Sequence, residues 1–188
     1  MKSKRTILVI AATAALSAFA LADHHKKDGK KESEFATNTI DLGCVVSDIE
    51  KSVKFYTEVV GFTEAGGFKV PADFATDAGL TDNKMLDIRV LVLGEGDGAT
   101  KLKLMQVEGG GNKKADHKHI DSTLGFSYIT VFIKSTDDAL ARMKKAGVKP
   151  IAKGPATLPA NLDPSMALTI VRDPDNNFVE LVGPKPTK

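Results

Sequence analysis

Apolar and polar residues alternate in a pattern that predicts the same order of elements twice along the chain. In the first half, residues 40–46 are apolar and β-branched, as is typical of a strand. The apolar residues from Ile49 to Val60 recur at helical spacing, and Gly61 is a suitable stop signal. The remaining elements expected in this half are three strands, over 62–70, 87–93 and 101–107.

The second half repeats this order after roughly 86 residues. A strand is expected over 126–133 and a helix over 135–146, which Gly147 ends. Three further strands are expected, over 148–152, 166–172 and 177–182. The sequence therefore predicts two modules, each with the order strand-helix-strand-strand-strand.

The first 22 residues have the pattern of an export signal. Three basic residues precede an apolar run at 7–18, and Ala20 and Ala22 form a small-x-small cleavage site. The run is short for a membrane span, which needs about 20 residues. We expect a signal peptide over 1–22, no stable membrane span after cleavage, and a periplasmic or secreted protein that begins at Asp23. The alternative is an uncleaved anchor.

Composition limits the remaining possibilities. A polar, charged stretch over 23–36 is expected to be a disordered linker, followed by one folded domain over 37–184, with modules at 37–108 and 124–184. The chain has 26 basic and 24 acidic residues, but three basic residues lie in the predicted leader, so the remainder is slightly acidic. This balance argues against a nucleic-acid partner. A single cysteine excludes a disulfide framework.

Two motifs carry a family resemblance. The first combines VSDIEKS at 46–52 with FY at 55–56 and GF at 61–62, and the second is DPDNNFVEL at 173–181. Together they resemble the vicinal oxygen chelate superfamily, which includes glyoxalase I, extradiol dioxygenases and bleomycin-resistance proteins. The resemblance implies an α+β fold in which two βαβββ modules form a cupped mixed sheet. It also implies an active site inside the cup, where metal-dependent members bind one divalent ion.

The resemblance assigns four ligand positions, one on the first and one on the last strand of each module. They fall on Asp41, Lys103, Tyr128 and Glu180. Only Glu180 matches the family pattern, and an ammonium group such as that of Lys103 does not bind metal at neutral pH. A catalytic transition metal normally needs three protein ligands. We therefore favour a site with no metal cofactor, with Glu180 and Asp41 as the ligands if a divalent metal does bind.

Without a metal, two inward carboxylates repel each other, and the Lys103 ammonium is a candidate replacement for the cation. We expect its nitrogen within ion-pair reach of Asp41 or Glu180, with Tyr128 in the same cavity. The alternative is that Lys103 and Glu180 lie on separate solvated strand faces. Breaking the pair costs about 3–5 kcal/mol if it is buried and about 0–1 kcal/mol if it is exposed.

Two functions remain open. The first is an exported protein that binds a small, apolar or weakly polar organic molecule, with Phe126 and Phe178 lining the cup. Core packing explains these phenylalanines equally well. The second is a metal-dependent lyase, isomerase or dioxygenase that acts on vicinal oxygens, with Glu180 and Tyr128 as catalytic candidates. The resemblance also leaves open whether a monomer closes one cup or a homodimer pairs modules across chains.

None of the four histidines falls on a ligand position: His24, His25, His117 and His119. We interpret the last two as part of an exposed connection between the modules, and the alternative places them at the mouth of the cavity. The first two would lie at the mature N-terminus, where a histidine in third position suits a copper or nickel chelate.

Overall fold

The computed structural model describes residues 34–37, 39–110 and 113–187. The chain divides into two units, 1–34 and 35–188, and the fold described below is that of the second unit. The predicted leader, its predicted cleavage site, His24 and His25 lie outside the described residues. Over the described ranges, no helix is long and apolar enough to cross a bilayer.

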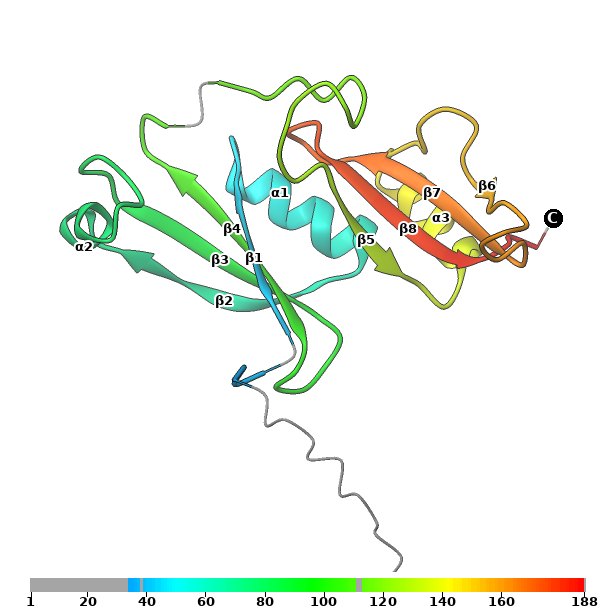
Figure 1. Ribbon diagram of the computed structural model, residues 1–188, viewed down its shortest axis with the longest axis horizontal. Helices are drawn as coiled ribbons and strands as arrows, with labels where there is room; N and C mark the ends of the chain where they lie inside the picture. Colours follow the sequence, from blue (N-terminus) through cyan, green and yellow to red (C-terminus); the bar gives the residue numbers. More distant parts are fainter. Residues whose placement is uncertain (1–33, 38, 111–112, 188) are drawn as a thin grey trace, which may run out of the picture. The chain divides into compact units, whose positions relative to one another are not determined.

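Module one contains a four-stranded sheet and its helices. Its elements are β1 (Asp41–Val45), α1 (Ile49–Phe55), the π-helical turn η1 (Tyr56–Val60), β2 (Thr63–Val70), α2 (Ala72–Asp77), β3 (Leu86–Leu93) and β4 (Thr100–Val107). The strand order is β1-β4-β3-β2, with β1 parallel to β4 and the other pairs antiparallel. β1 is therefore an edge strand (Figure 1).

Module two repeats this topology. Its elements are β5 (Tyr128–Phe132), α3 (Thr136–Lys145), β6 (Ala156–Thr157), β7 (Met166–Arg172) and β8 (Phe178–Pro184). The strand order is β5-β8-β7-β6, and β5, like β1, is an edge strand parallel to its neighbour. The prediction of an α+β fold with two βαβββ modules is confirmed.

The short strand of module two was predicted in the wrong place. It lies at Ala156–Thr157 and not over 148–152. Pro150 stands in the middle of the predicted strand and has no N–H for a sheet ladder. Only Ile151 of that segment donates to β7, through its N–H to the Ile170 carbonyl at 2.8 Å.

Local signals explain where the helices begin and end. The Asp48 carboxylate accepts from the Lys51 N–H at 3.1 Å, and the Ser135 hydroxyl accepts from the Asp138 N–H at 3.1 Å. Both are N-cap contacts. The first helix does not stay α-helical to Val60, because its last turn widens to the π-helical η1. Gly61 then ends it with φ of 106°, a left-handed conformation that suits glycine.

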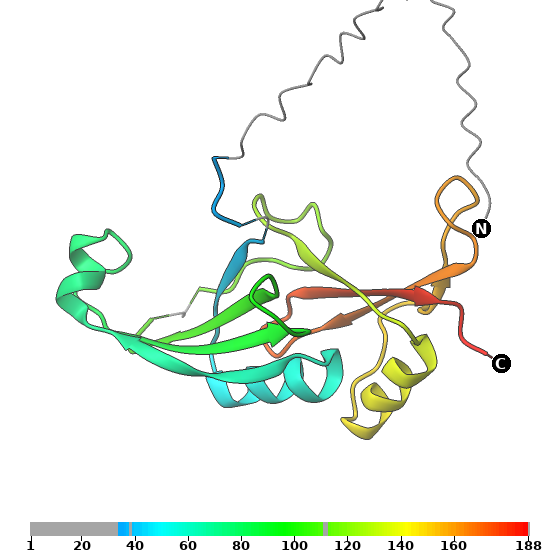
Figure 2. The ribbon, with the colours of Figure 1, turned by 90° about the horizontal axis from the view of Figure 1, so that it is seen from below.

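Each sheet buries one face against a helix, as Figure 2 shows for α1 and α3. Side chains alternate along a strand, so Leu102 and Leu104 of β4 face the core while Lys101 and Lys103 face the opposite way. Leu181 of β8 is also fully buried, and its neighbour Glu180 lies on the opposite face. We call the sheet face opposite the helix the cup face of each module.

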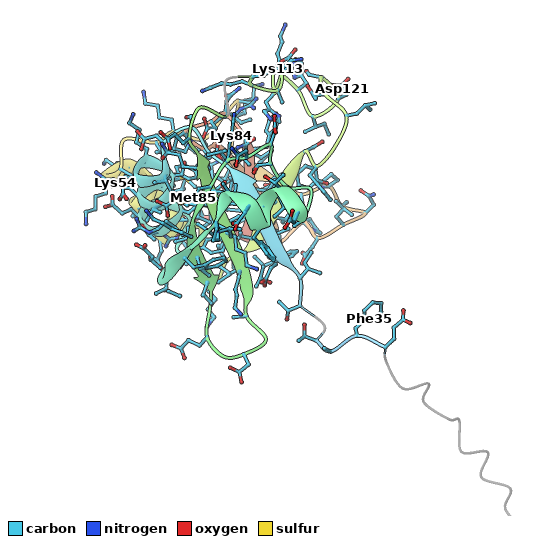
Figure 3. The ribbon with its side chains drawn as sticks, turned by 90° about the vertical axis from the view of Figure 1, so that its left-hand side faces the viewer. Phe35, Lys54, Lys84, Met85, Lys113 and Asp121 are labelled. Carbon is cyan, nitrogen blue, oxygen red and sulfur yellow. The ribbon has the colours of Figure 1, made fainter. Side chains whose placement is uncertain are left out.

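The loop between β2 and β3 is anchored at the far end of module one. It carries the short helix α2 and buries Ala75 completely. Lys84 donates from Nζ to the Gly109 carbonyl at 3.2 Å, which ties the loop to the end of β4. Figure 3 shows Lys84 and Met85 beside α2. This segment therefore packs against its own module.

Candidate functional site

A cleft of about 480 Å³ lies between the edge strands β1 and β5. Four aromatic side chains line it: Tyr56, Phe126, Tyr128 and Phe178. Aliphatic side chains, among them Leu42 and Ile129, make up much of the remaining wall, and the polar side chains are few: Asp41, Cys44, Ser127 and Asn177. The cleft is thus mainly apolar, with isolated polar groups, as is typical of small-molecule sites.

The strand registers make the predicted ligand positions of the two modules equivalent. Gly43 is opposite Lys103 in module one, and Thr130 is opposite Glu180 in module two. Asp41 and Tyr128 precede Gly43 and Thr130 by two residues, so each lies on the same face as its module's last-strand position. All four positions therefore belong to the cup faces.

Lys103 pairs with Asp41 across the cup face of module one. The Lys103 Nζ lies 2.8 Å from Asp41 Oδ2, and their side chains are 35% and 38% exposed. The hydrogen bond from Lys103 lowers the pKa of Asp41, against a smaller opposing effect of burial. Asp41 lines the cleft but Lys103 does not. The ammonium therefore neutralises Asp41 from beside the cleft.

Glu180 has a different partner. Its carboxylate accepts a hydrogen bond from the Thr130 hydroxyl at 2.8 Å, on the cup face of module two. Tyr128 lines the cleft and is half exposed, whereas Glu180 does not line it. The structure therefore brings Asp41, Tyr128, Phe126 and Phe178 around one cleft and leaves Lys103 and Glu180 on the flanking cup faces.

These residues do not fit a divalent metal centre. The Lys103 ammonium, a cation, already contacts Asp41, and the remaining position, Tyr128, carries a phenol in place of a carboxylate or an imidazole. Within residues 34–37, 39–110 and 113–187, no three groups of the metal-binding types gather closely enough to hold an ion. The two carboxylates present are both engaged: Asp41 is paired with Lys103, and Glu180 accepts a hydrogen bond from the Thr130 hydroxyl. We therefore assign no chemical step to a metal at this site.

A buried carboxylate joins the two modules next to the cleft. Asp173 is 5% exposed and accepts the Tyr56 hydroxyl of module one at 3.0 Å. It also accepts the backbone N–H groups of Asp175 and Asn177 and the Asn177 amide. Burial, followed by the Asp173 charge, raises the pKa of Tyr56 far above its ordinary value. Tyr56 is therefore a neutral hydrogen-bond donor.

The sequence analysis used Asp173 only as the first residue of the second family motif. Its contact with Tyr56 was missed, although one signal was present. Tyr56 falls on the buried face of a helix, and a buried tyrosine hydroxyl usually finds a polar partner. Three further hydrogen bonds join the modules: the Ser47 N–H donates to Asp175 at 2.9 Å, and Arg142 donates to the carbonyls of Val59 at 3.2 Å and Val60 at 3.4 Å.

Cys44 is a half-buried free thiol in the wall of the cleft. Burial, with a contribution from the carboxylates of Asp173 and Asp175, raises its pKa to about 11. The thiol is therefore protonated at neutral pH and reacts slowly with electrophiles. Because the chain has one cysteine, this thiol is a specific chemical reporter for the cleft.

The connection between the modules lies against the aromatic wall of the cleft. The His117 ring meets Phe178 edge-on, with centroids 6.5 Å apart. The Arg172 guanidinium lies over the same phenyl ring, 3.5 Å from its centroid, and donates to the Lys118 carbonyl at 3.2 Å. His117 thus flanks the cleft, as the alternative interpretation proposed, whereas His119 is exposed.

Comparisons with known proteins agree with this topology. A family model described as the Glyoxalase/Bleomycin resistance protein/Dioxygenase superfamily matches residues 40–181. A search of curated proteins found no match.

Solved structures share the fold at low sequence identity. A glyoxalase family protein from Bacillus cereus superposes with a TM-score of 0.64 at 15% identity, covering 82% of this chain and 97% of that one. A glyoxylase/bleomycin resistance protein/dioxygenase domain from Frankia gives 0.56 at 20% identity, covering 83% and 96%. A glyoxalase I mutant from Zea mays gives 0.56 at 17% identity, and this chain spans 46% of it. The family match covers most of the chain, which therefore belongs to the Glyoxalase/Bleomycin resistance protein/Dioxygenase superfamily.

Proposed function

We propose that this protein binds a small organic molecule in the cleft between β1 and β5, without a metal, and that it does so after export. The observation that carries the proposal is the aromatic lining of the cleft. Tyr56 closes its inner side, and Phe126, Tyr128 and Phe178 contribute from module two. Aromatic rings provide large apolar contact areas for a flat or cyclic ligand.

The size and exposure of the cleft support the same function. Its volume of about 480 Å³ is within the range of small-molecule sites, about 300–1,000 Å³. Phe126 is fully exposed to solvent and Tyr128 is half exposed. A bound ligand would remove this apolar surface from water, which is the main source of affinity in such sites.

Export is supported by the leader pattern and by the single cysteine. Residues 1–22 have the charge and apolar pattern of a signal peptide. Burial and a raised pKa protect Cys44 from oxidation, which suits an oxidising compartment. N-terminal sequencing of secreted protein tests this proposal: we expect Asp23 first, and an intact Met1 would contradict it.

The metal-dependent enzyme is the weaker alternative. A metal would have to displace Lys103 from Asp41 and Thr130 from Glu180. The other ligand position of each module holds Lys103 in module one and Tyr128 in module two. Metal analysis of the purified protein separates the two functions. Stoichiometric zinc, nickel, iron or manganese would favour the enzyme.

Two exposed phenylalanines on or next to β5 provide a matched test of the cleft. Phe126 lines the cleft, whereas Phe132 is 78% exposed and lines a separate hollow beside α3. The probe is phenylnaphthylamine, a neutral dye that fluoresces in apolar surroundings. We expect Phe126→Ala to raise its Kd about tenfold, since a contact of this size contributes about 1–2 kcal/mol. Equal Kd values for Phe126→Ala and Phe132→Ala would contradict the proposal.

A further inference from the structure

A second hollow, of about 210 Å³, adjoins the apolar cleft at the C-terminal end of β1. The two share Val45 and Asn177 as lining residues. The second hollow is polar, and four of its lining residues come from the connection between the modules: Lys113, Lys114, Ala115 and His117. A molecule that fills the cleft and extends past Val45 therefore meets the side chains of this connection.

The lysines at this end have unused hydrogen-bonding capacity. Within the described part of the chain, Lys113 makes no hydrogen bond or ion pair, and its side chain is exposed. Lys114 is 62% exposed, and its ammonium lies 3.5 Å from Asp175 in a long ion pair. An ammonium group has three donors, so each lysine can still bind an anionic oxygen.

The nearby carboxylates are already engaged by the protein. Asp175 accepts the Ser47 N–H, and its side chain is only 11% exposed. Asp173 is buried and accepts from Tyr56, Asn177 and the turn backbone. Asp175 also lines the second hollow, but its carboxylate is engaged by the Ser47 N–H and by Lys114, so the solvent-exposed charges among the lining residues are those of Lys113 and Lys114.

We propose that the ligand of the cleft is an amphipathic anion, whose apolar body packs between β1 and β5 and whose carboxylate, sulfonate or phosphate group binds Lys113 and Lys114. This inference rests on the proposed function, because it names the class of molecule that the same cleft takes. It assigns the aromatic wall to the body of the ligand and the connection between the modules to its charged end.

Two dyes that differ by one anionic group test the proposal. Anilinonaphthalene sulfonate is phenylnaphthylamine with an added sulfonate. The readout is the change in Kd of each dye between wild-type protein and a variant. In the double variant Lys113→Gln/Lys114→Gln, we expect the Kd of the sulfonate to rise about tenfold and that of the neutral dye to change less than twofold. Added salt should reduce the affinity for the sulfonate more than that for the neutral dye.

Two control variants distinguish direct binding of the sulfonate by Lys113 and Lys114 from an effect of the protein's net charge. Lys54→Gln removes a lysine from the exposed side of α1, in a part of the surface separate from Lys113 (Figure 3). It should leave both Kd values unchanged, and Lys114→Arg should keep the affinity for the sulfonate. If the double variant affects both dyes equally, or neither, the anionic ligand is ruled out while the cleft stands. If neither dye binds the wild-type protein, both proposals fail.

Discussion

The two modules have the same strand order, and each pairs its edge strand in parallel with its last strand, yet equivalent positions on these strands make different contacts. On the cup face of module one, Lys103 pairs with Asp41 at 2.8 Å. On the cup face of module two, Glu180 accepts a hydrogen bond from Thr130 at 2.8 Å. The resemblance places metal-ligand positions on both modules, and the last-strand position of module one holds Lys103, whose ammonium does not bind metal at neutral pH.

The turns that join the last two strands of each module also differ. In module one, residues 94–98 join β3 to β4 in an exposed, glycine-rich turn. In module two, the turn between β7 and β8 buries Asp173, which holds Tyr56 of the other module. Module two therefore supplies the buried carboxylate that contacts the other module and most of the aromatic wall of the cleft. Module one supplies the ion pair between Lys103 and Asp41.

The largest effect is expected at the buried turn. Asp173→Ala leaves the Tyr56 hydroxyl and the N–H groups of Asp175 and Asn177 without their acceptor. An unsatisfied buried polar group costs about 1–3 kcal/mol, so we expect a loss of about 3 kcal/mol in the free energy of unfolding, measured by urea denaturation. Asp97→Ala, in the equivalent turn of module one, should change it by less than about 0.5 kcal/mol. Equal losses would show that the turns are alike.

The alkylation rate of Cys44 measures the electrostatic effect of the module-two carboxylates on a thiol of module one. Its pKa of about 11 predicts alkylation at pH 8 at least about tenfold slower in the folded than in the unfolded protein, with a rate that rises up to about pH 11. Asp175→Asn removes one nearby carboxylate and should speed the reaction. Asp41→Asn, in module one, should not, because Asp41 does not contribute to this pKa. A rate that levels off near pH 8.5 would contradict the raised pKa.

Lys103→Glu tests whether the lysine alone keeps metal away. The variant places a carboxylate beside Asp41, at the position equivalent to Glu180. Without metal it should be less stable at neutral pH, because like charges meet. If Asp41 can act as a ligand, millimolar manganese or nickel should raise its melting temperature by a few degrees. Adding Glu180→Gln should abolish this shift, and an equal shift in wild-type protein would refute the role of Lys103.

The smallest effect is expected from removing the ion pair itself. Lys103→Met should lower the urea midpoint only slightly, because both partners are more than one third exposed. The pKa of Asp41 is lowered in the folded state, so the pair stabilises the fold above the ordinary value of 3.8 and this stabilisation is lost as the pH falls below it. The difference between variant and wild type should therefore disappear in acid. A large loss at pH 7 would show that the pair is effectively buried.

The sequence predicted the repeated topology because its signals are local. Asp48 and Ser135 act as helix caps, and Gly61 ends the first helix in the conformation that glycine favours. The resemblance, together with charge balance, also predicted that Lys103 pairs with Asp41 or Glu180, and the structure pairs it with Asp41. Sequence reasoning missed the hydrogen bond from Tyr56 to Asp173, which joins the modules, and the packing of His117 and Arg172 on Phe178. Tyr56 and His117 contact residues far away in the chain, which no local pattern identifies, whereas Arg172 and Phe178 are cross-strand neighbours in the β7–β8 hairpin.

The central claim, that the cleft between β1 and β5 binds a small organic molecule, is tested most directly at Cys44. The single thiol lines the cleft, so a molecule bound there blocks access to it. Alkylation by a maleimide is measured at pH 8.5 with and without saturating phenylnaphthylamine. We predict that the bound dye slows the reaction at least about tenfold, in step with its binding curve. An unchanged rate at full dye occupancy would place the binding elsewhere and contradict the account.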